Sequence, residues 1–333
     1  MTSLPANLLT DVAGIRIGHA DDARLGSGVT AIVFDEPAVA AIDIRGGGPG
    51  TRETDLLDPA MTVERIDGIA LSGGSAFGLD AGVGIQAYLR EQGRGFLVRS
   101  ARIPIVPGAI LFDLLAGGDK NWGRYPPYRE LGYQAAALAA SGFALGSVGA
   151  GLGATTVNFK GGVGSASATV ASGHTIGVLA AVNPAGSVVI GSGPHFWAGA
   201  FEHEAEFGGL GWPNRVPSQA LAPVTKAGRL ESTTLAVVAT DVRLNKAQLK
   251  RLAIMAQTGL GRAIYPVHTP LDGDVVFAVS TGQRSLADPV LGLVELGTAA
   301  ANVLARSVAR AVYEATPLPF AGALPAWKLQ FRS

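Results

Sequence analysis

The stretch RLESTTLAVVATDVRLNK, residues 229–246, decides the fold and poses the central question about this chain. Residues 235–239 are short, apolar and partly β-branched, which predicts a buried β-strand. A Ser-Thr-Thr cluster, residues 232–234, stands directly before that strand. Hydroxyl groups at the mouth of a strand ordinarily bond nearby backbone groups in a turn. The rest of the sequence favours a chemical role for the cluster.

The composition indicates a well-buried globular protein. Apolar residues make up 48% of the 333 residues and charged residues 16%, which excludes a disordered chain. Lys plus Arg equals Asp plus Glu, at 26 each. No basic field is therefore available to hold nucleic acid or an anionic membrane.

The chain has no cysteine, which excludes disulfides, thiolate metal sites and a cysteine nucleophile. The N-terminal sequence lacks the basic and apolar regions of a secretory signal, so a cytoplasmic protein is expected. The apolar window GYQAAALAASGFALGSVGAG, residues 132–151, is too rich in small residues for a membrane span. It predicts a buried helix followed by a strand.

The order of the predicted elements favours a mixed α/β sandwich in a single domain, residues 1–333. Strands occur in adjacent pairs as well as alternating with helices, which disfavours a pure βαβ array. Asn245 and Gln248 form a capping-box pair at the start of one helix. The expected strands are residues 15–18, 30–34, 38–44, 68–71, 175–182, 187–190, 234–239 and 275–279, and the expected helices are 77–92, 245–260 and 289–315.

Two further features concern the backbone. The 46 glycines are not periodic and cluster at 45–50, 71–78, 149–154 and 160–164, which predicts tight turns and close backbone approaches at strand ends. Residues 191–230 have four prolines and little periodicity, so they form a long irregular connection. It ends at the Ser-Thr-Thr cluster, where a self-cleavage site would be expected.

Three other positions carry candidate chemistry, each with an ordinary alternative. Asp272 and Asp274 are two residues apart, so in an extended chain both carboxylates project to one side; the alternative is a solvated Asp-Gly-Asp turn. Lys160 precedes a glycine pair and is either buried and paired or part of a loop. Asn183 precedes a proline, which is typical of a turn, although its amide could donate to an oxyanion.

These signals together resemble one family over nearly the whole chain: the self-processing P1-family peptidases. That family includes the L-aminopeptidase/D-esterases, the β-peptidyl aminopeptidases and the nylon-oligomer endo-hydrolases. The motifs that carry the resemblance are, in order, DVAGIRIGHA, AIDIRGGGPGTRETDLL, LSGGSAFGLDAGVG, IPIVPGAILFDL, GAGLGA, KGGVGSAS, VNPAG, STTLAVVATDVRL and HTPLDGDVVFAVSTG.

The resemblance implies a four-layer αββα sandwich of the N-terminal-nucleophile type. It also implies a precursor that cleaves itself between Ser232 and Thr233 into chains 1–232 and 233–333, and a homotetramer of such αβ units. The family nucleophile falls on Thr233, its two acidic residues on Asp272 and Asp274, its lysine on Lys160 and its oxyanion asparagine on Asn183.

The implied mechanism uses a free α-amine on Thr233, which titrates near ~7.7–8.0 and deprotonates its own hydroxyl. No metal or cofactor is needed. The expected substrate is a short peptide or a linear amino-acid amide or oligomer, with an amide of the SGGS loop as a second oxyanion donor. The expected substrate-binding residues are Ser72, Gly73, Gly74, Ser75, Phe77, Ile110 and Phe112.

The chain departs from the family pattern in three places. Ser232 stands where the family usually has Asn or Gly, and Thr234 offers a second hydroxyl beside the cut. Segment 106–114 has no clean match to the acidic residue that reads a substrate amine in the aminopeptidase branch, and its aromatic residue is Phe112 rather than a tyrosine.

Three other functions stay open at this point. One is an acyl transferase like ornithine acetyltransferase, which shares the sandwich and a self-generated threonine. Another is an unprocessed, non-catalytic binding protein of the same fold. The third is a metal hydrolase using His195, His203, Glu202, Glu204 and Glu206, although their spacing matches no metal-binding helix.

Overall fold

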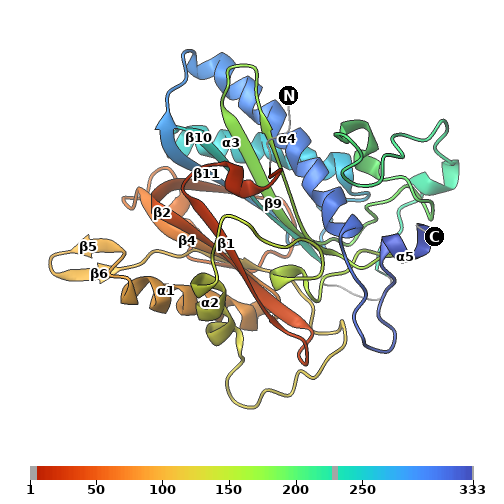
Figure 1. Ribbon diagram of the computed structural model, residues 1–333, viewed down its shortest axis with the longest axis horizontal. Helices are drawn as coiled ribbons and strands as arrows, with labels where there is room; N and C mark the ends of the chain where they lie inside the picture. The colour runs from red at the N-terminus through yellow and green to blue at the C-terminus, as the bar shows by residue number, and fades with distance from the viewer. Residues whose placement is uncertain (1–5, 227–231, 332–333) are drawn as a thin grey trace.

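The computed structural model describes residues 6–226 and 232–331, which contain one large mixed sheet and a small hairpin (Figure 1). The strand order of the large sheet is β3-β7-β4-β2-β11-β10-β9-β8, with β1 also paired to β2, and β5 pairs with β6. The strands are β1 (Ile15–Asp22), β2 (Ser27–Ile44), β3 (Thr51–Arg52), β4 (Arg65–Ser72), β5 (Phe96–Val98), β6 (Ala101–Ile103), β7 (Gly108–Ile110), β8 (Gly162–Thr169), β9 (Thr175–Asn183), β10 (Thr233–Val242) and β11 (Val275–Arg284).

The helices cover the sheet on two sides. In Figure 1, α3 and α4 lie on one side of the strands, and α1 and α2 lie on the other. Helix α4 packs on β8 and β9, whereas α2 packs on β1 and β2. The helices are α1 (Ala81–Glu91), α2 (Tyr128–Ala137), α3 (Lys246–Ala263), α4 (Pro289–Tyr313) and the short α5 (Trp327–Phe331).

The strands form two layers because the long strand β2 belongs to both. Residues 27–34 of β2 pair with β1, and residues 39–44 pair with β11. Three cores separate the resulting four layers. One lies under α3 and α4, one under α1 and α2, and one between the two strand layers. This arrangement is the predicted αββα sandwich.

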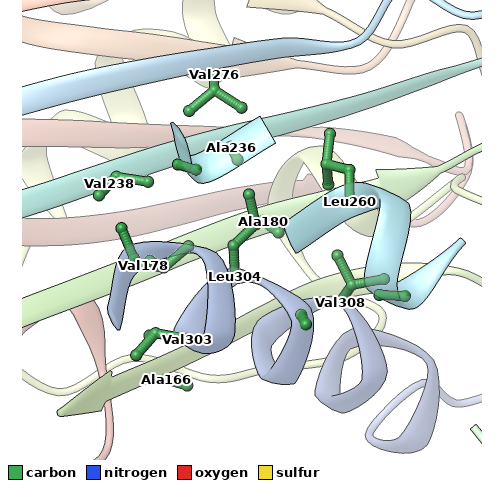
Figure 2. Close-up of a cluster of buried hydrophobic side chains, with 14 of the residues drawn as sticks. Ala166, Val178, Ala180, Ala236, Val238, Leu260, Val276, Val303, Leu304 and Val308 are labelled. Carbon is green, nitrogen blue, oxygen red and sulfur yellow. The ribbon is translucent and has the colours of Figure 1, made fainter. Parts of the chain in front are cut away.

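Strand alternation distributes the side chains among these cores. On β10, Leu235 and Val237 enter the central core, while Ala236 and Val238 face the helices. Figure 2 shows how Val238 lies with side chains of β9 and α4 in the core under α3 and α4. All residues of β10 are buried, so the Thr-Thr pair at its start is carried into the middle of the molecule.

Most predicted elements are confirmed, including the capping box. Asn245 accepts the Gln248 backbone N–H at 2.9 Å, and Gln248 accepts the Asn245 N–H at 3.0 Å. The irregular segment is confirmed as far as residue 226, since residues 191–226 contain only short 3₁₀ turns and an isolated bridge at Phe196. Residues 227–230 lie outside the described part of the chain.

Other predictions were wrong in detail. The runs 30–34 and 38–44 form one strand, because β2 continues through an irregularity in its pairing with β4. Residues 187–190 make only isolated bridges, Ser187 to Tyr265 and Val189 to Phe196. No strand follows α2 in residues 142–148, while the unpredicted strand β8 forms from the small residues 162–169. Small side chains give weak periodicity, so packing decides their structure.

No helix in the described ranges is long and apolar enough to cross a membrane.

Glycine at position 164 sets the close contact between β8 and α4. A Cβ there would lie 1.9 Å from the Ser307 carbonyl oxygen. We expect Gly164→Ala to lower the free energy of unfolding by at least ~2 kcal/mol, because backbone must move to admit the methyl group. The matched control is Gly261→Ala on α3, where a Cβ meets nothing within 4 Å and helix propensity predicts a gain of ~0.5–1 kcal/mol. Urea denaturation of both variants measures this difference; equal effects would contradict the packing argument.

Candidate active site

The Ser232–Thr233 peptide lies between two neighbouring segments of the sheet. Thr233 is opposite Asn183 in the antiparallel pairing of β10 with β9. Ser232 forms a parallel bridge with Asp272, just before β10 and β11 begin to pair. The ends of β9, β10 and β11 thus bring together four predicted residues from three separate motifs.

The carbonyl group of Ser232 is held from two sides. The Thr233 hydroxyl donates to the Ser232 oxygen at 2.6 Å, and the Gly273 backbone N–H donates to the same oxygen at 2.7 Å. The absence of a side chain at Gly273 permits this, because a Cβ would lie 2.7 Å from the Thr233 Oγ1. Ser232 and Thr233 are both buried. This peptide therefore has a hydroxyl and a polarising donor at its carbonyl.

The glycine-rich stretch 45–50 supports the Asp-Gly-Asp segment from behind. The Arg45 N–H donates to the Asp274 carbonyl and the Gly48 N–H to the Asp272 carbonyl. A Cβ on Gly46 would lie 2.3 Å from the Asp272 carbonyl oxygen. Close backbone packing thus explains this glycine cluster, as the sequence predicted.

The two aspartates are buried and take different partners. Asp272 accepts the Ala185 N–H at 2.9 Å and both the N–H and the hydroxyl of Thr269, at 2.9 and 2.7 Å. Asp274 accepts the Thr234 N–H at 2.8 Å. They are therefore not a solvated turn. Asp272 shapes the loops around the strand mouth, and Asp274 fixes the start of β10.

Asp274 also binds His268, which the sequence prediction missed. His268 Nδ1 lies 2.8 Å from Asp274 Oδ2, and the His268 N–H donates to the same oxygen at 3.2 Å. Burial raises the pKa of Asp274, the His268 hydrogen bond opposes that shift, and nearby Asp272 adds to it. The two carboxylates are therefore close enough to interact electrostatically.

Asn183 is held by contacts at both ends of its amide. Its Nδ2 donates to the Phe112 carbonyl at 3.0 Å. Its Oδ1 accepts the Thr155 N–H at 2.9 Å and the Lys226 ammonium at 3.0 Å. These contacts orient the amide next to Thr233, its partner across the strand pair.

Lys160 is buried, and its hydrogen bonds run to backbone carbonyl oxygens. Its ammonium donates to the carbonyls of Gly151, Ala154 and Gly161 at 2.8–2.9 Å. Burial lowers its pKa to about 7, Asp113 opposes the shift and Lys226 adds to it. These contacts tie the two glycine-rich motifs 149–154 and 160–164 together; a role at Thr233 stays a prediction.

The SGGS loop uses its amides within the fold. The N–H groups of Gly73 and Ser75 donate to the carbonyls of Gly28 and Leu111, and that of Gly74 donates to Asp113 at 2.8 Å. The predicted second oxyanion donor is therefore not free there, whereas Gly273 already donates to the Ser232 carbonyl. Ser72 donates to the Gly73 carbonyl.

The predicted apolar wall residues have different surroundings. Phe77 is half exposed and packs edge-on against Trp122, with ring centroids 5.3 Å apart. Ile110 is buried and pairs with Gly50 through its N–H. Phe112 lies at the site itself, through the carbonyl that binds Asn183.

A small cavity adjoins Asn183. Two of the residues that line it, Asp113 and Lys226, were missed by the sequence prediction. Its volume is about 20 Å³, and Phe112, Asp113, Thr155 and Lys226 contribute to its wall. Asp113 is buried and accepts the Ser27 hydroxyl at 2.6 Å, and burial raises its pKa. Asp113 lies in the motif IPIVPGAILFDL, directly after the predicted wall residue Phe112. It also falls in segment 106–114, where the sequence comparison with the aminopeptidase branch sought an acidic residue and found no clean match.

Two of the three acidic residues of the proposed metal segment, Glu202 and Glu206, have structural roles. Glu206 forms an ion pair with Arg306 at 2.5 Å, and Glu202 accepts the backbone N–H groups of Phe207 and Gly209. In the described ranges, no group of three acidic or histidine side chains is arranged to hold a metal ion. The geometry therefore gives the metal-hydrolase alternative no support.

Comparison with known proteins identifies the family. The model of peptidase family S58 matches residues 7–323. The chain belongs to peptidase family S58. Its relatives include a Mycobacterium tuberculosis protein named "uncharacterized aminopeptidase", which is 43% identical over 334 residues, or 94% of this chain and 95% of the relative. A Paenarthrobacter ureafaciens 6-aminohexanoate-oligomer endohydrolase is 30% identical over 289 residues, or 83% of this chain and 75% of the relative.

Solved structures of low identity share the fold. The L-aminopeptidase D-Ala-esterase/amidase from Ochrobactrum anthropi, described as a variant of the Ntn hydrolase fold, superposes with a TM-score of 0.72 at 22% identity, over 99% of this chain and 95% of that one. A Burkholderia sp. β-aminopeptidase gives 0.71 at 22% identity, over 98% and 92%. The S58 protein thus has the predicted Ntn-type fold, and its family and relatives make it a peptidase or amidase.

Lys160 predicts a pH dependence of stability. Its pKa is about 7 in the folded chain and ~10.4 when unfolded, so the unfolded chain binds the proton more tightly between these values. This group therefore makes folding more favourable as pH rises from ~7 to ~10, and its penalty is fully present below pH ~7. The stability difference between wild type and Lys160→Met should change in favour of wild type by up to ~1.4 kcal/mol per pH unit in that window. Urea denaturation across it measures the change; a constant difference would contradict the burial effect.

Proposed function

We propose that this S58 protein is a precursor that cleaves itself between Ser232 and Thr233 and then acts as an N-terminal-threonine amide hydrolase. The observation that carries the proposal is the pair of contacts at the Ser232 carbonyl, from the Thr233 hydroxyl at 2.6 Å and the Gly273 N–H at 2.7 Å. A carbonyl held beside a nucleophile and polarised by a buried N–H is prepared for attack.

The cleavage step balances without a cofactor. The Thr233 Oγ forms a bond to the Ser232 carbonyl carbon, while the Gly273 N–H stabilises the charge on oxygen. The C–N bond then breaks, and the hydroxyl proton passes to the departing nitrogen. Water hydrolyses the resulting ester, which leaves a carboxylate on Ser232 and a free hydroxyl and α-amine on Thr233.

The same groups then serve external substrates. The new α-amine accepts the hydroxyl proton, because such amines titrate near ~7.7–8.0. Asp274 holds the start of strand β10 by accepting the Thr234 N–H, and Asn183 lies opposite Thr233 in the neighbouring strand. The Thr233 Oγ forms a bond to the substrate carbonyl carbon, the C–N bond breaks, and the α-ammonium group returns the proton to the departing amine. Water then hydrolyses the ester on Thr233, which releases the substrate acid and restores the hydroxyl.

The small cavity beside Asn183 supports cleavage before turnover. In the uncut chain its volume is about 20 Å³, with Lys226 in its wall, which is less than any peptide substrate needs. Lys226 lies in the segment that leads to Ser232, so cutting the chain at Ser232 releases one end of that segment. Substrate access and processing are thereby coupled.

The relatives and the lining suggest the substrate class. We propose short peptides and linear amino-acid amides or oligomers, because relatives are named as aminopeptidases and as 6-aminohexanoate-oligomer endohydrolases. Asp113 in the cavity wall is a buried carboxylate, which provides a partner for a substrate ammonium group.

Thr233→Ala tests the nucleophile directly. We expect a single uncut chain of 33.9 kDa on a denaturing gel and no hydrolysis of amino-acid p-nitroanilides, because the attacking oxygen is gone. The control is Thr234→Val, which keeps the branched shape and removes a buried hydroxyl that has no partner in the described part of the chain; it should be cut normally. If Thr233→Ala splits and Thr234→Val does not, Thr234 is the nucleophile.

Gly273→Ala tests the polarising contact. The added methyl group would lie 2.7 Å from both the Thr233 Oγ1 and the Gly48 carbonyl oxygen, so it must displace one of them. Processing should slow by about 10²-fold or more, the usual effect of losing one oxyanion donor. Gly142→Ala, where a Cβ meets nothing within 4 Å, should process at the wild-type rate. A time course on denaturing gels measures both, and normal processing of Gly273→Ala would exclude this donor.

A further inference from the structure

A second, much larger cavity lies beside the candidate active site. Its volume is about 670 Å³, within the range of small-molecule sites. The irregular segment 191–226 supplies much of its wall, and Figure 1 shows this segment as green-to-turquoise loops at the edge of the sandwich, near α5. No step of the mechanism above uses this cavity.

The cavity is continuous with the framework that holds the candidate catalytic residues. The Ser187 N–H and carbonyl pair with Tyr265, both residues lining the cavity. Two residues earlier, the Ala185 N–H donates to Asp272. Val224 lines the large cavity and Lys226 the small one, so the segment before the cut separates the two.

The lining is largely apolar, with an aromatic pair. The rings of Trp197 and Tyr265 lie 5.5 Å apart at 48°, and Val189 and Ile190 add aliphatic surface. The Tyr265 hydroxyl donates to the Leu221 carbonyl at 2.8 Å, which holds the segment over the cavity. Such walls bind an apolar chain by removing its surface from water.

The charge of the lining is one-sided. Arg215 contributes a guanidinium, His195 an imidazole, and among the described residues that line the cavity none is Asp or Glu. A guanidinium matches a carboxylate through paired N–H donors. An ammonium group would find aromatic faces but no counter-ion.

We propose that this cavity binds an unbranched apolar chain that ends in a carboxylate, with Arg215 holding the carboxylate. This assignment rests on the function proposed above. The bound apolar chain is then the distal part of a linear amide substrate whose scissile bond lies at Thr233. Arg215 is exposed, so its contribution is that of a surface ion pair, roughly a two- to fivefold effect on affinity.

A binding experiment tests the cavity independently of catalysis. Hexanoate, hexanamide and hexylammonium share one chain and differ in charge, and calorimetry on the wild-type protein ranks them. We expect hexanoate to bind about two- to fivefold more tightly than hexanamide, with hexylammonium weakest. Arg215→Met should abolish the preference for hexanoate, whereas Arg102→Met, at an exposed arginine of strand β6 outside the lining, should keep it. Equal affinities, tightest binding of hexylammonium, or no binding would overturn the proposal.

A kinetic experiment tests the connection to Thr233. Linear amides with a six-carbon tail ending in carboxylate or in amide are compared with a short anilide. Arg215→Met should raise KM for the carboxylate-tailed substrate about two- to fivefold and leave its kcat unchanged. Both KM and kcat for the short anilide should stay at their wild-type values. Equal changes for all three would overturn the substrate assignment. If no amide is hydrolysed while hexanoate still binds at Arg215, the proposed function fails and the cavity assignment stands.

Discussion

The hydrogen bond from the Gly273 N–H to the Ser232 carbonyl is the contact on which the site depends. It pairs the segment before β10 with the segment before β11. The Thr233 hydroxyl then lies within hydrogen-bond distance of the Ser232 carbonyl. Backbone donors are well suited to this task because they are already oriented by the sheet and lose little freedom when charge develops. The glycine clusters follow from the same requirement, since Gly46 and Gly273 both stand where a side chain would collide with backbone or with the Thr233 hydroxyl.

The sandwich supplies a rigid setting for that contact. β10 is central in the sheet, with β9 and β11 as its neighbours, and its side chains alternate between two cores. Asp274 and Asp272 are buried and held by backbone N–H groups, which compensates the cost of removing carboxylates from water. The burial that raises the pKa of Asp274 is thus a consequence of placing the candidate site between strand ends instead of on the surface.

The segment before Ser232 contributes to the walls of both cavities. Lys226 binds Asn183 and lines the small cavity, while residues between 213 and 224 of the same segment line the large one. One irregular connection therefore lies beside the candidate nucleophile and forms much of the wall of the large cavity. Irregular connections of this kind often carry binding and catalytic residues on a rigid scaffold.

The sequence by itself determined the fold class, the family and the set of residues at the strand mouths, because apolar alternation, capping residues and ordered motifs are local properties of the chain. It also predicted the irregular course of the connection 191–230, which is confirmed as far as residue 226. Only the tertiary structure decided which groups meet. It gave Asp272 and Asp274 different partners, tied Lys160 to three carbonyls, consumed the amides of the SGGS loop and assigned the Ser232 carbonyl to Gly273. It also added His268, Asp113 and Lys226 to the site. Several of these pairings join positions far apart in the chain, such as Ala185 with Asp272 and Lys226 with Asn183, and no local pattern encodes the distance between them.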